Sequence, residues 1–377
     1  MKNAPDFIKP ATWLKILDYA NNGGGPSPYL LMDEETIREK IAVVGKNIRN
    51  AHVFYAIKAN PDRQLVELVN SLGIGFEIAS EGELEILKAL GIEPEKIITS
   101  NPVKTVGFIE RLFAYGVRYF AFDSADEVKK LSKLAPGAHV YVRLSVPNEG
   151  SEWPLSKKFG VEIDEASELL VMARRSGLDP VGITFHVGSQ CTNIYNWDSA
   201  IQKAWRLWNI AESKGVRLNM LNIGGGYPVT YTKRVDDIAT IEQRVNRLLR
   251  DTFPEETRVF LEPGRAIVGD AGFFVSTVIG KAKRDAEDWL YIDLGVFGGM
   301  MESIGGIQYS YYVAGGKEEK TWVLAGPTCD SFDVIARDVK LPEPEIGDRF
   351  IIPASGAYTT SYASAFNGFP MPKTVII

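Results

Sequence analysis

The sequence has 377 residues, of which 45% are hydrophobic and 24% are charged, a composition typical of a globular protein with a well-buried core. Its net charge of −6 provides no electrostatic attraction for nucleic acid or an anionic membrane, so we expect neither as a partner. Two cysteines and three histidines exclude a disulfide framework and a Cys- or His-rich metal site. Because the N-terminal residues lack the apolar run of a signal peptide and no apolar run could span a bilayer, we expect a cytoplasmic location.

Short apolar runs alternate with amphipathic stretches over the first two-thirds of the chain. The runs are rich in β-branched and aromatic residues, which favours buried strands, at 51–57, 73–78, 96–99, 117–122, 138–144, 181–185, 219–223 and 258–261. Helices are predicted between them, at 62–72, 82–90, 104–115, 125–134, 163–176, 194–215 and 238–252, with Ser80 and Ser124 as N-caps. This alternation predicts an α/β protein whose residues 33–272 form an eight-stranded parallel β/α (TIM-type) barrel, with an open doubly wound sheet as the alternative.

The pattern changes after about residue 272. Strands are predicted at 273–281, 288–294, 307–313, 320–325 and 348–352, without long amphipathic helices between them. We therefore predict a second, all-β domain made of residues 273–377 together with residues 1–32, which precede the first barrel strand.

Chemically useful residues gather where the barrel strands end, which is where the active site of a β/α barrel lies. They are Lys58, Glu77, Arg143, His186, the triplet Gly224-Gly225-Gly226 and the segment Glu262-Pro263-Gly264-Arg265. A lysine after an apolar strand is partly desolvated, which favours Schiff-base chemistry, and a glycine turn lets backbone amides approach a phosphate.

Each of these residues also has a purely structural interpretation. Lys58 could extend to the surface, and the glycine triplet could be a flexible turn. His186 could be a structural histidine instead of stacking on an aromatic cofactor. Glu262 could pair with Arg265 instead of holding a pyridinium nitrogen protonated. In the β domain, Cys329-Asp330-Ser331-Phe332-Asp333 offers a proton donor and a carboxylate for a cationic substrate, with a buried, inert cysteine as the alternative.

Taken together, the motifs FYAIKAN, GFEIAS, HVGSQ, GGGYP, EPGR, CDS and GAYT resemble the pyridoxal-phosphate (PLP)-dependent ornithine/diaminopimelate/arginine decarboxylase family, over about residues 28–370. The resemblance implies an alanine-racemase-like fold, PLP as cofactor and decarboxylation of a basic amino acid, L-ornithine or L-lysine, to putrescine or cadaverine in polyamine biosynthesis. It implies that Lys58 binds PLP, that His186 stacks on its ring and that Glu262 pairs with the ring nitrogen. It also places Glu77, Glu83 and Arg143 near the cofactor, and Ser189, Gly224, Gly225, Gly226, Gly264, Arg265 and Tyr358 around it, most of them at the phosphate.

The same resemblance implies a head-to-tail homodimer whose active sites are shared across the interface. Cys329 would be the proton donor and Asp330 would receive the distal amine of the substrate, both acting in the partner's site. Lys158 would pair with Asp333 across the interface, and Phe366 would lie there close to the substrate.

The choice of substrate depends on a few positions. This chain reads Cys-Asp-Ser at 329–331, as ornithine and lysine enzymes do, where diaminopimelate enzymes typically read Cys-Glu-Ser. Residues 295–302 look more like the bacterial ornithine/lysine enzymes, and Gly306 stands where eukaryotic enzymes place an aspartate. Glu302 is a candidate substitute ligand, with a solvated glutamate as the alternative. A diaminopimelate decarboxylase, a PLP racemase and a non-catalytic regulatory relative remain the alternative functions.

Overall fold

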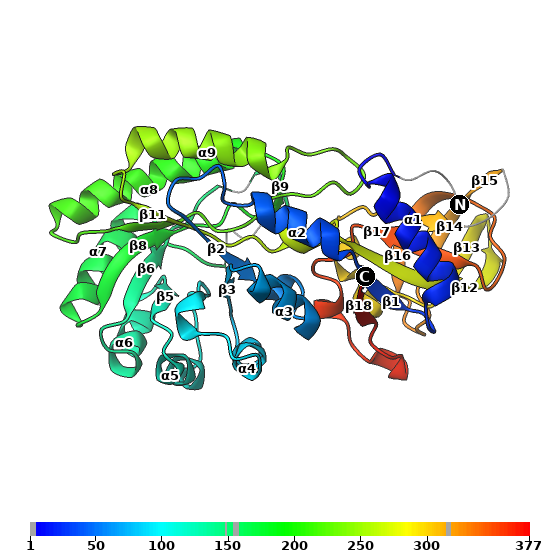
Figure 1. Ribbon diagram of the computed structural model, residues 1–377, viewed down its shortest axis with the longest axis horizontal. Helices are drawn as coiled ribbons and strands as arrows, with labels where there is room; N and C mark the ends of the chain where they lie inside the picture. The colour runs from blue at the N-terminus through cyan, green and yellow to red at the C-terminus, as the bar shows by residue number, and fades with distance from the viewer. Residues whose placement is uncertain (1–4, 148, 154–157, 314–317) are drawn as a thin grey trace. The chain divides into compact units, whose positions relative to one another are not determined.

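The computed structural model describes residues 5–147, 149–153, 158–313 and 318–377, and the chain divides into two compact units (Figure 1). The barrel unit comprises Lys40–Pro228 and Asp236–Ala266, and the sheet unit comprises Met1–Glu39, Val229–Val235 and Ile267–Ile377. These limits lie a few residues from the expected limits at 33 and 272. The short stretch 229–235 belongs to the sheet unit because Tyr231 packs edge-on against Tyr309 and its carbonyl accepts a hydrogen bond from Ser310.

Eight parallel strands close into a barrel in the order β10-β11-β2-β3-β4-β5-β6-β8. They are β2 (Ala51–Ala56), β3 (Gly75–Glu77), β4 (Ile97–Thr99), β5 (Tyr119–Phe122), β6 (His139–Arg143), β8 (Asp179–Thr184), β10 (Met220–Asn222) and β11 (Arg258–Leu261). Each lies within or overlaps one of the predicted apolar runs. The closed ring confirms the barrel and is inconsistent with the open doubly wound sheet.

The predicted helices are also present and surround the strands (Figure 1). They are α3 (Arg63–Ser71), α4 (Glu81–Ala89), α5 (Val106–Tyr115), α6 (Ala125–Leu134), α7 (Ile163–Arg175), α8 (Tyr195–Ser213) and α9 (Ile238–Thr252). The expected caps are confirmed, because the Ser80 hydroxyl accepts from the Glu83 amide and the Ser124 hydroxyl accepts from the Glu127 amide. Such caps satisfy amides that have no partner inside the helix, so each helix begins at a defined residue.

Large side chains fill the inside of the barrel. One cluster of buried residues comes from seven different strands: Phe54, Ile98, Ala121, Tyr141, Val181, Met220 and Phe260. Because side chains of this size leave a packed core and no channel, chemistry in this unit is confined to the two ends of the barrel.

The sheet unit contains an eight-stranded sheet with the path β14-β17-β12-β13-β15-β16. Strand β1 pairs with β12, and β18 pairs with β1. Its strands are β1 (Tyr29–Met32), β12 (Gly272–Arg284), β13 (Glu287–Ile292), β14 (Tyr312–Val313), β15 (Glu319–Ala325), β16 (Val334–Pro342), β17 (Arg349–Pro353) and β18 (Lys373–Ile376). The expectation of a purely β domain is wrong in one respect, because α1 (Pro10–Asp18) and α11 (Met301–Ile304) belong to this unit. Trp13 and Ile16 of α1 join its hydrophobic core. The helix α2 (Glu34–Val43) runs from this unit into the barrel unit.

Three strands of this sheet, β1, β16 and β18, were not predicted. In β16 the apolar alternation is interrupted by Arg337 and Asp338, and Asp338 has a positive φ of 57°. The pairing with β15 also shifts register nearby, between Trp322 and Leu324. Such irregularities break the period of two on which strand prediction depends.

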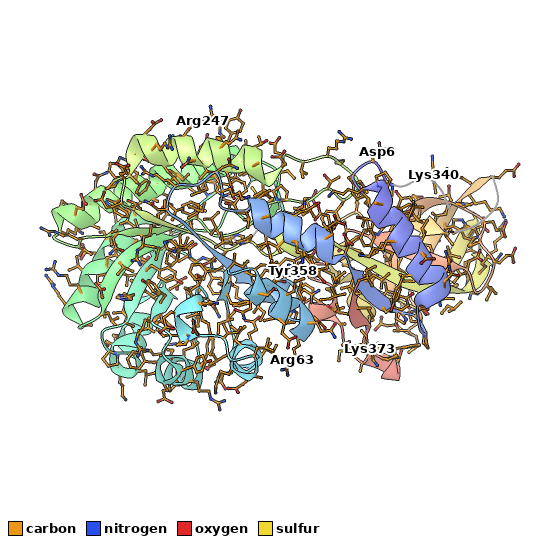
Figure 2. All side chains as sticks on the ribbon, in the orientation of Figure 1. Asp6, Arg63, Arg247, Lys340, Tyr358 and Lys373 are labelled. Carbon is orange, nitrogen blue, oxygen red and sulfur yellow. The ribbon has the colours of Figure 1, made fainter. Side chains whose placement is uncertain are left out.

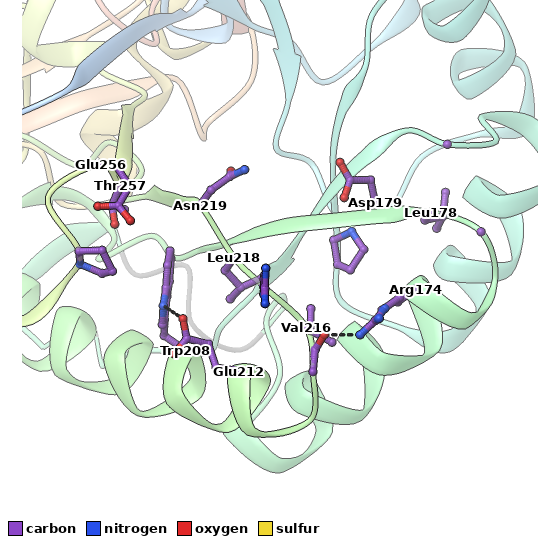
Figure 3. Close-up of a pocket in the computed structure, with 16 residues that line it drawn as sticks. Arg174, Leu178, Asp179, Trp208, Glu212, Val216, Leu218, Asn219, Glu256 and Thr257 are labelled. Carbon is purple, nitrogen blue, oxygen red and sulfur yellow. Dashed lines mark hydrogen bonds between the residues drawn. The ribbon is translucent and has the colours of Figure 1, made fainter.

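A pocket of about 1020 Å³ opens at the N-terminal ends of the barrel strands, close to the starts of β8 and β11 (Figure 3). Its polar groups pair with one another: Arg174 donates to the Gly215 carbonyl, and Trp208 Nε1 lies 3.2 Å from Glu212 Oε1. The residues predicted for catalysis lie at the opposite ends of the strands, so this pocket is not the candidate site. Within the described ranges, no helix is long and apolar enough to cross a membrane, and no group of acidic, His and Cys side chains could hold a metal ion.

Candidate active site at the barrel mouth

Lys58 lies in the short helical turn Ile57–Ala59 that follows β2. Its Nζ is 2.5 Å from Glu77 Oε2, at the end of the neighbouring strand β3. The Lys58 side chain is 44% exposed, whereas Glu77 is 2% exposed. A buried counter-ion therefore positions an amine that is partly covered and remains accessible, and activation of Lys58 by partial desolvation stays a prediction.

Glu262, directly after β11, is held by two polar side chains from other strand ends. Ser100 Oγ and Asn222 Nδ2 both donate to Glu262 Oε1, and Tyr141 OH lies 2.8 Å from Ser100 Oγ. Burial and the nearby Glu77 carboxylate raise the pKa of Glu262 to about 7. The partners of Glu262 are thus neutral donors, which disfavours the alternative of an ion pair with Arg265.

The glycine turn follows β10 and lies against His186 and Glu262. A Cβ at Gly224 would lie 2.4 Å from the Phe185 carbonyl oxygen, and one at Gly225 would lie 2.3 Å from the Glu262 carbonyl oxygen. Gly224 also has a positive φ of 66°. No larger residue fits there, because a Cβ would overlap backbone carbonyl oxygens, so the triplet is a tight turn packed closely against the neighbouring segments.

Two further polar groups meet beside this turn. Arg265 Nη2 donates to Ser189 Oγ at 3.0 Å, and Arg265 is 3% exposed. Gly264, also buried, directly precedes Arg265. A buried guanidinium beside a hydroxyl and a glycine turn suits a phosphate group.

His186 is neutral at physiological pH. Burial, with the positive charges of Arg143 and Lys58, lowers its pKa to about 3. The Gly188 amide donates to His186 Nδ1 at 3.0 Å, so the ring proton lies on Nε2. Burial also lowers the pKa of Arg143, whose guanidinium lies 5.3 Å from the centre of the Phe159 ring.

Glu83 contributes a second carboxyl group with a raised pKa near the Lys58–Glu77 pair. Its Oε2 accepts a hydrogen bond from the Ala79 amide at 2.6 Å. Burial, and to a lesser degree the Glu77 charge, raises its pKa to about 7. Glu83 therefore binds a proton near neutral pH and also helps to define the start of α4.

The sheet unit carries the remaining predicted residues. Cys329 is exposed, which is inconsistent with the alternative of a buried, inert cysteine, and its amide donates to Asn367 Oδ1 at 3.0 Å. Asp330 is also exposed, and its Oδ1 accepts from the Phe332 amide at 2.8 Å. The loop thus presents a thiol and a carboxylate to solvent.

Asp333 has a different environment from the one that we expected. It is 2% exposed, and its carboxylate accepts from the Val296 amide at 2.7 Å and from the Thr328 amide and hydroxyl at 3.0 and 2.7 Å. The expected ion pair with Lys158 across an interface stays a prediction. Asp333 joins two loops of its own unit. Lys158 is exposed, with its ammonium 5.0 Å from the centre of the Phe159 ring.

Three other predicted residues lie in the sheet unit. Glu302 in α11 is 3% exposed, so the alternative of a solvated glutamate is wrong. Tyr358, labelled in Figure 2, has a positive φ of 55° and lies 6.3 Å from the ring of Tyr362. Phe366 is 37% exposed and packs its ring 4.5 Å from that of Phe297.

Ser100, Tyr141 and Asn222 were not predicted as site residues. Ser100 directly follows β4, and Asn222 ends β10 immediately before the glycine turn. The available signal was a polar residue at the C-terminal end of an apolar barrel strand, the same signal that identified Glu77 and Glu262. Tyr141 lies inside β6, where its sequence position resembles that of an ordinary core aromatic.

The residues of the barrel mouth fit PLP. The accessible amine suits the aldehyde of that cofactor, and the buried carboxyl suits its ring nitrogen. The buried arginine with its serine, beside the tight glycine turn, suits its phosphate.

Comparisons with known proteins agree with this geometry. Residues 34–269 match the family described as "pyridoxal-dependent decarboxylase, pyridoxal binding domain". The chain is 37% identical to a lysine/ornithine decarboxylase of Selenomonas ruminantium, over 93% of this chain and 90% of that protein. The crystal structure of lysine decarboxylase from S. ruminantium superposes with a TM-score of 0.90 at 35% identity, covering 100% of this chain and 97% of the other. For the Vibrio vulnificus lysine/ornithine decarboxylase complexed with cadaverine, the TM-score is 0.89 at 32% identity, with coverage of 97% and 98%.

Proposed function

The chain belongs to the pyridoxal-dependent decarboxylase family, and we propose that it removes the α-carboxylate of L-lysine or L-ornithine. The observation that carries the proposal is the convergence of Lys58, His186, Glu262 and the glycine turn at one end of the barrel. Relatives named lysine/ornithine decarboxylase support the choice of substrate. The products would be cadaverine or putrescine, formed in the cytoplasm as precursors of polyamines.

PLP, when bound, supplies an electron sink for the charge left at the α-carbon after carbon dioxide departs. Lys58 would hold it covalently through its accessible amine, and Gly224–Gly226, Ser189 and Arg265 would bind its phosphate. Glu262 would keep a proton at the ring nitrogen. His186, neutral and with its proton on Nε2, offers a flat face that excludes water without adding charge.

We further propose that the protein acts as a homodimer in which the Cys329 loop completes the site of the partner subunit. Several apolar side chains in this part of the sheet unit are exposed, among them Phe332, Phe366, Phe369 and Met371. Apolar surface beside polar functional groups favours burial against another protein. Cys329 would protonate the α-carbon, Asp330 would receive the distal amine, and Phe366 would line the substrate cavity.

Cofactor binding and product analysis test this proposal. Purified protein should take up PLP and turn yellow. After borohydride reduction, the cofactor should remain covalently attached to Lys58. The enzyme should then be offered L-lysine, L-ornithine, L-arginine and meso-diaminopimelate in competition. It should release carbon dioxide and a diamine from L-lysine and L-ornithine in preference to the other two. A protein that takes up no PLP would refute the function. Racemisation without carbon dioxide would instead identify a racemase.

A further inference from the structure

Both donors to Glu262 reach the same carboxylate oxygen. Ser100 Oγ and Asn222 Nδ2 contact Oε1, and in the described part of the chain no hydrogen bond reaches Oε2. The Gly224 amide donates to Asn222 Oδ1 at 2.9 Å. Since Oδ1 is thereby the acceptor, the amide group of Asn222 faces Glu262, and it can only donate.

The position of the Ser100 proton follows from its neighbours. Asn222 Nδ2 lies 3.3 Å from Ser100 Oγ and can donate its second proton there. Tyr141 OH lies 3.0 Å from the Thr99 carbonyl, which gives the phenol proton an acceptor. With these two protons placed, the Ser100 hydroxyl proton points to Glu262 Oε1. All of the donors are buried, so the arrangement is shielded from water.

These donors oppose the other influences on Glu262. Burial and the Glu77 charge favour the neutral acid, whereas Lys58, Ser100 and Asn222 favour the carboxylate. Among the described residues, the charged or titratable groups around it are Glu77 at the end of β3, Lys58 after β2, Tyr141 and Arg143 of β6, and the neutral His186. Without its two donors, Glu262 would be a stronger base and would hold a proton more tightly.

We propose that Ser100 and Asn222 are positioning residues that keep Glu262 anionic, so that the proton it shares with the ring nitrogen of bound PLP resides on the nitrogen. This inference rests on the proposed function. The proton would be shared between the Glu262 carboxylate and the ring nitrogen of the bound cofactor, and nothing is oxidised or reduced. A protonated nitrogen is the form that withdraws electrons, so the two residues act on the reaction through Glu262.

Asn222 has two functions that one substitution separates. Its Oδ1 accepts from the Gly224 amide and holds the phosphate turn, whereas its Nδ2 donates to Glu262. Asn222→Asp retains an acceptor for Gly224 but removes the donor. Ser100→Ala removes the other donor. Thr99→Val is a matched control, because Thr99 is equally buried and its hydroxyl has no hydrogen-bond partner among the residues that the structure describes.

The experiment is ¹⁵N NMR of holoenzyme reconstituted with PLP labelled at the ring nitrogen, recorded between about pH 6 and pH 9. Wild type and Thr99→Val should show the chemical shift of a protonated nitrogen. Ser100→Ala and Asn222→Asp should move the signal toward the unprotonated value, and Ser100→Thr should restore it. We also expect kcat to fall about tenfold in Ser100→Ala, with KM little changed.

The outcomes distinguish failure of the proposed function from failure of the role of Ser100 and Asn222. Wild-type protein that binds no PLP would refute the proposed function. A different result would overturn the role of these residues while leaving the function intact. In that case the ring nitrogen is protonated in wild type, and its ¹⁵N chemical shift is unchanged in Ser100→Ala and Asn222→Asp. If Ser100→Ala fails to fold, Asn222→Asp, which keeps the Gly224 contact, decides alone.

Discussion

At the scale of single residues, Glu83 should make stability depend on pH. Burial raises its pKa to about 7, so the folded state holds this proton more tightly than the unfolded chain does. The resulting stabilisation is fully present below the ordinary carboxyl pKa and is lost as pH rises to about 7. At about 1.4 kcal/mol per unit, the shift corresponds to at most about 3.5 kcal/mol.

Thermal unfolding of wild type and Glu83→Gln at about pH 5 and about pH 8 measures this contribution. Wild type should lose stability relative to the variant at the higher pH, because the amide does not titrate. Glu262 titrates in the same range, but it is present in both proteins and cancels. A Tm difference that stays constant across the range would contradict the prediction.

Residue identities in the barrel mouth were predictable because strand ends are visible in the sequence. Lys58, Glu77 and Glu262 each follow or end an apolar run, so barrel geometry alone brings them together. Their protonation was not predictable. The pKa of His186 and that of Glu262 depend on burial and on neighbouring charges from distant parts of the chain, which only the folded structure supplies.

At the scale of structural elements, Asp333 should stabilise the loop that carries Cys329. Asp333→Ala would leave the Val296 amide and the Thr328 amide and hydroxyl without their acceptor inside the protein. We expect a loss of about 2–4 kcal/mol in unfolding free energy and a lower kcat, because the loop is no longer held. Asp330→Asn, three residues earlier in the same loop and exposed, is the control and should leave Tm unchanged.

A buried ion pair joins α6 to the segment before α5. Lys104 Nζ lies 2.9 Å from Glu127 Oε1, and both side chains are almost fully buried. Burial lowers the pKa of Lys104 to about 8, which shows that the cation is costly to keep there. Lys104→Met should destabilise the barrel by about 3 kcal/mol, because buried Glu127 and the Asn101 and Ala121 carbonyls lose a partner. Lys130 still pairs with Glu127, which limits the loss.

The matched control for this prediction is Lys129→Met. Lys129 pairs with Asp126 at the surface of α6, where the ammonium side chain is 65% exposed. Its loss should change stability by less than about 1 kcal/mol, since exposed pairs contribute little. Equal effects of the two substitutions in urea unfolding would refute the importance of the buried pair.

At the scale of the whole molecule, the proposed shared site predicts complementation between inactive variants. Lys58→Ala and Cys329→Ala should each lose diamine production. After subunit exchange, half of the dimers are mixed and one of the two sites in each is intact, so about a quarter of wild-type activity should return. Lys58→Ala mixed with Glu262→Gln is the control and should recover nothing, because both changes affect the barrel.

The sequence by itself determined the eight barrel strands and most of the second sheet, and it predicted Lys58 as the lysine that binds the cofactor. These features follow from the period of apolar residues and from motifs that are local in the chain. Strand β16 and the helices of the sheet unit were missed because tertiary packing overrides a broken local pattern there.

Only the tertiary structure decided how the predicted groups are held. It showed that the buried Glu77 contacts the Lys58 amine, and that Asp333 bonds within its own unit. It also brought Ser100 and Asn222 to one oxygen of Glu262. These contacts join residues that are distant in sequence, and their energies depend on exclusion of water, so no local pattern of residues encodes them.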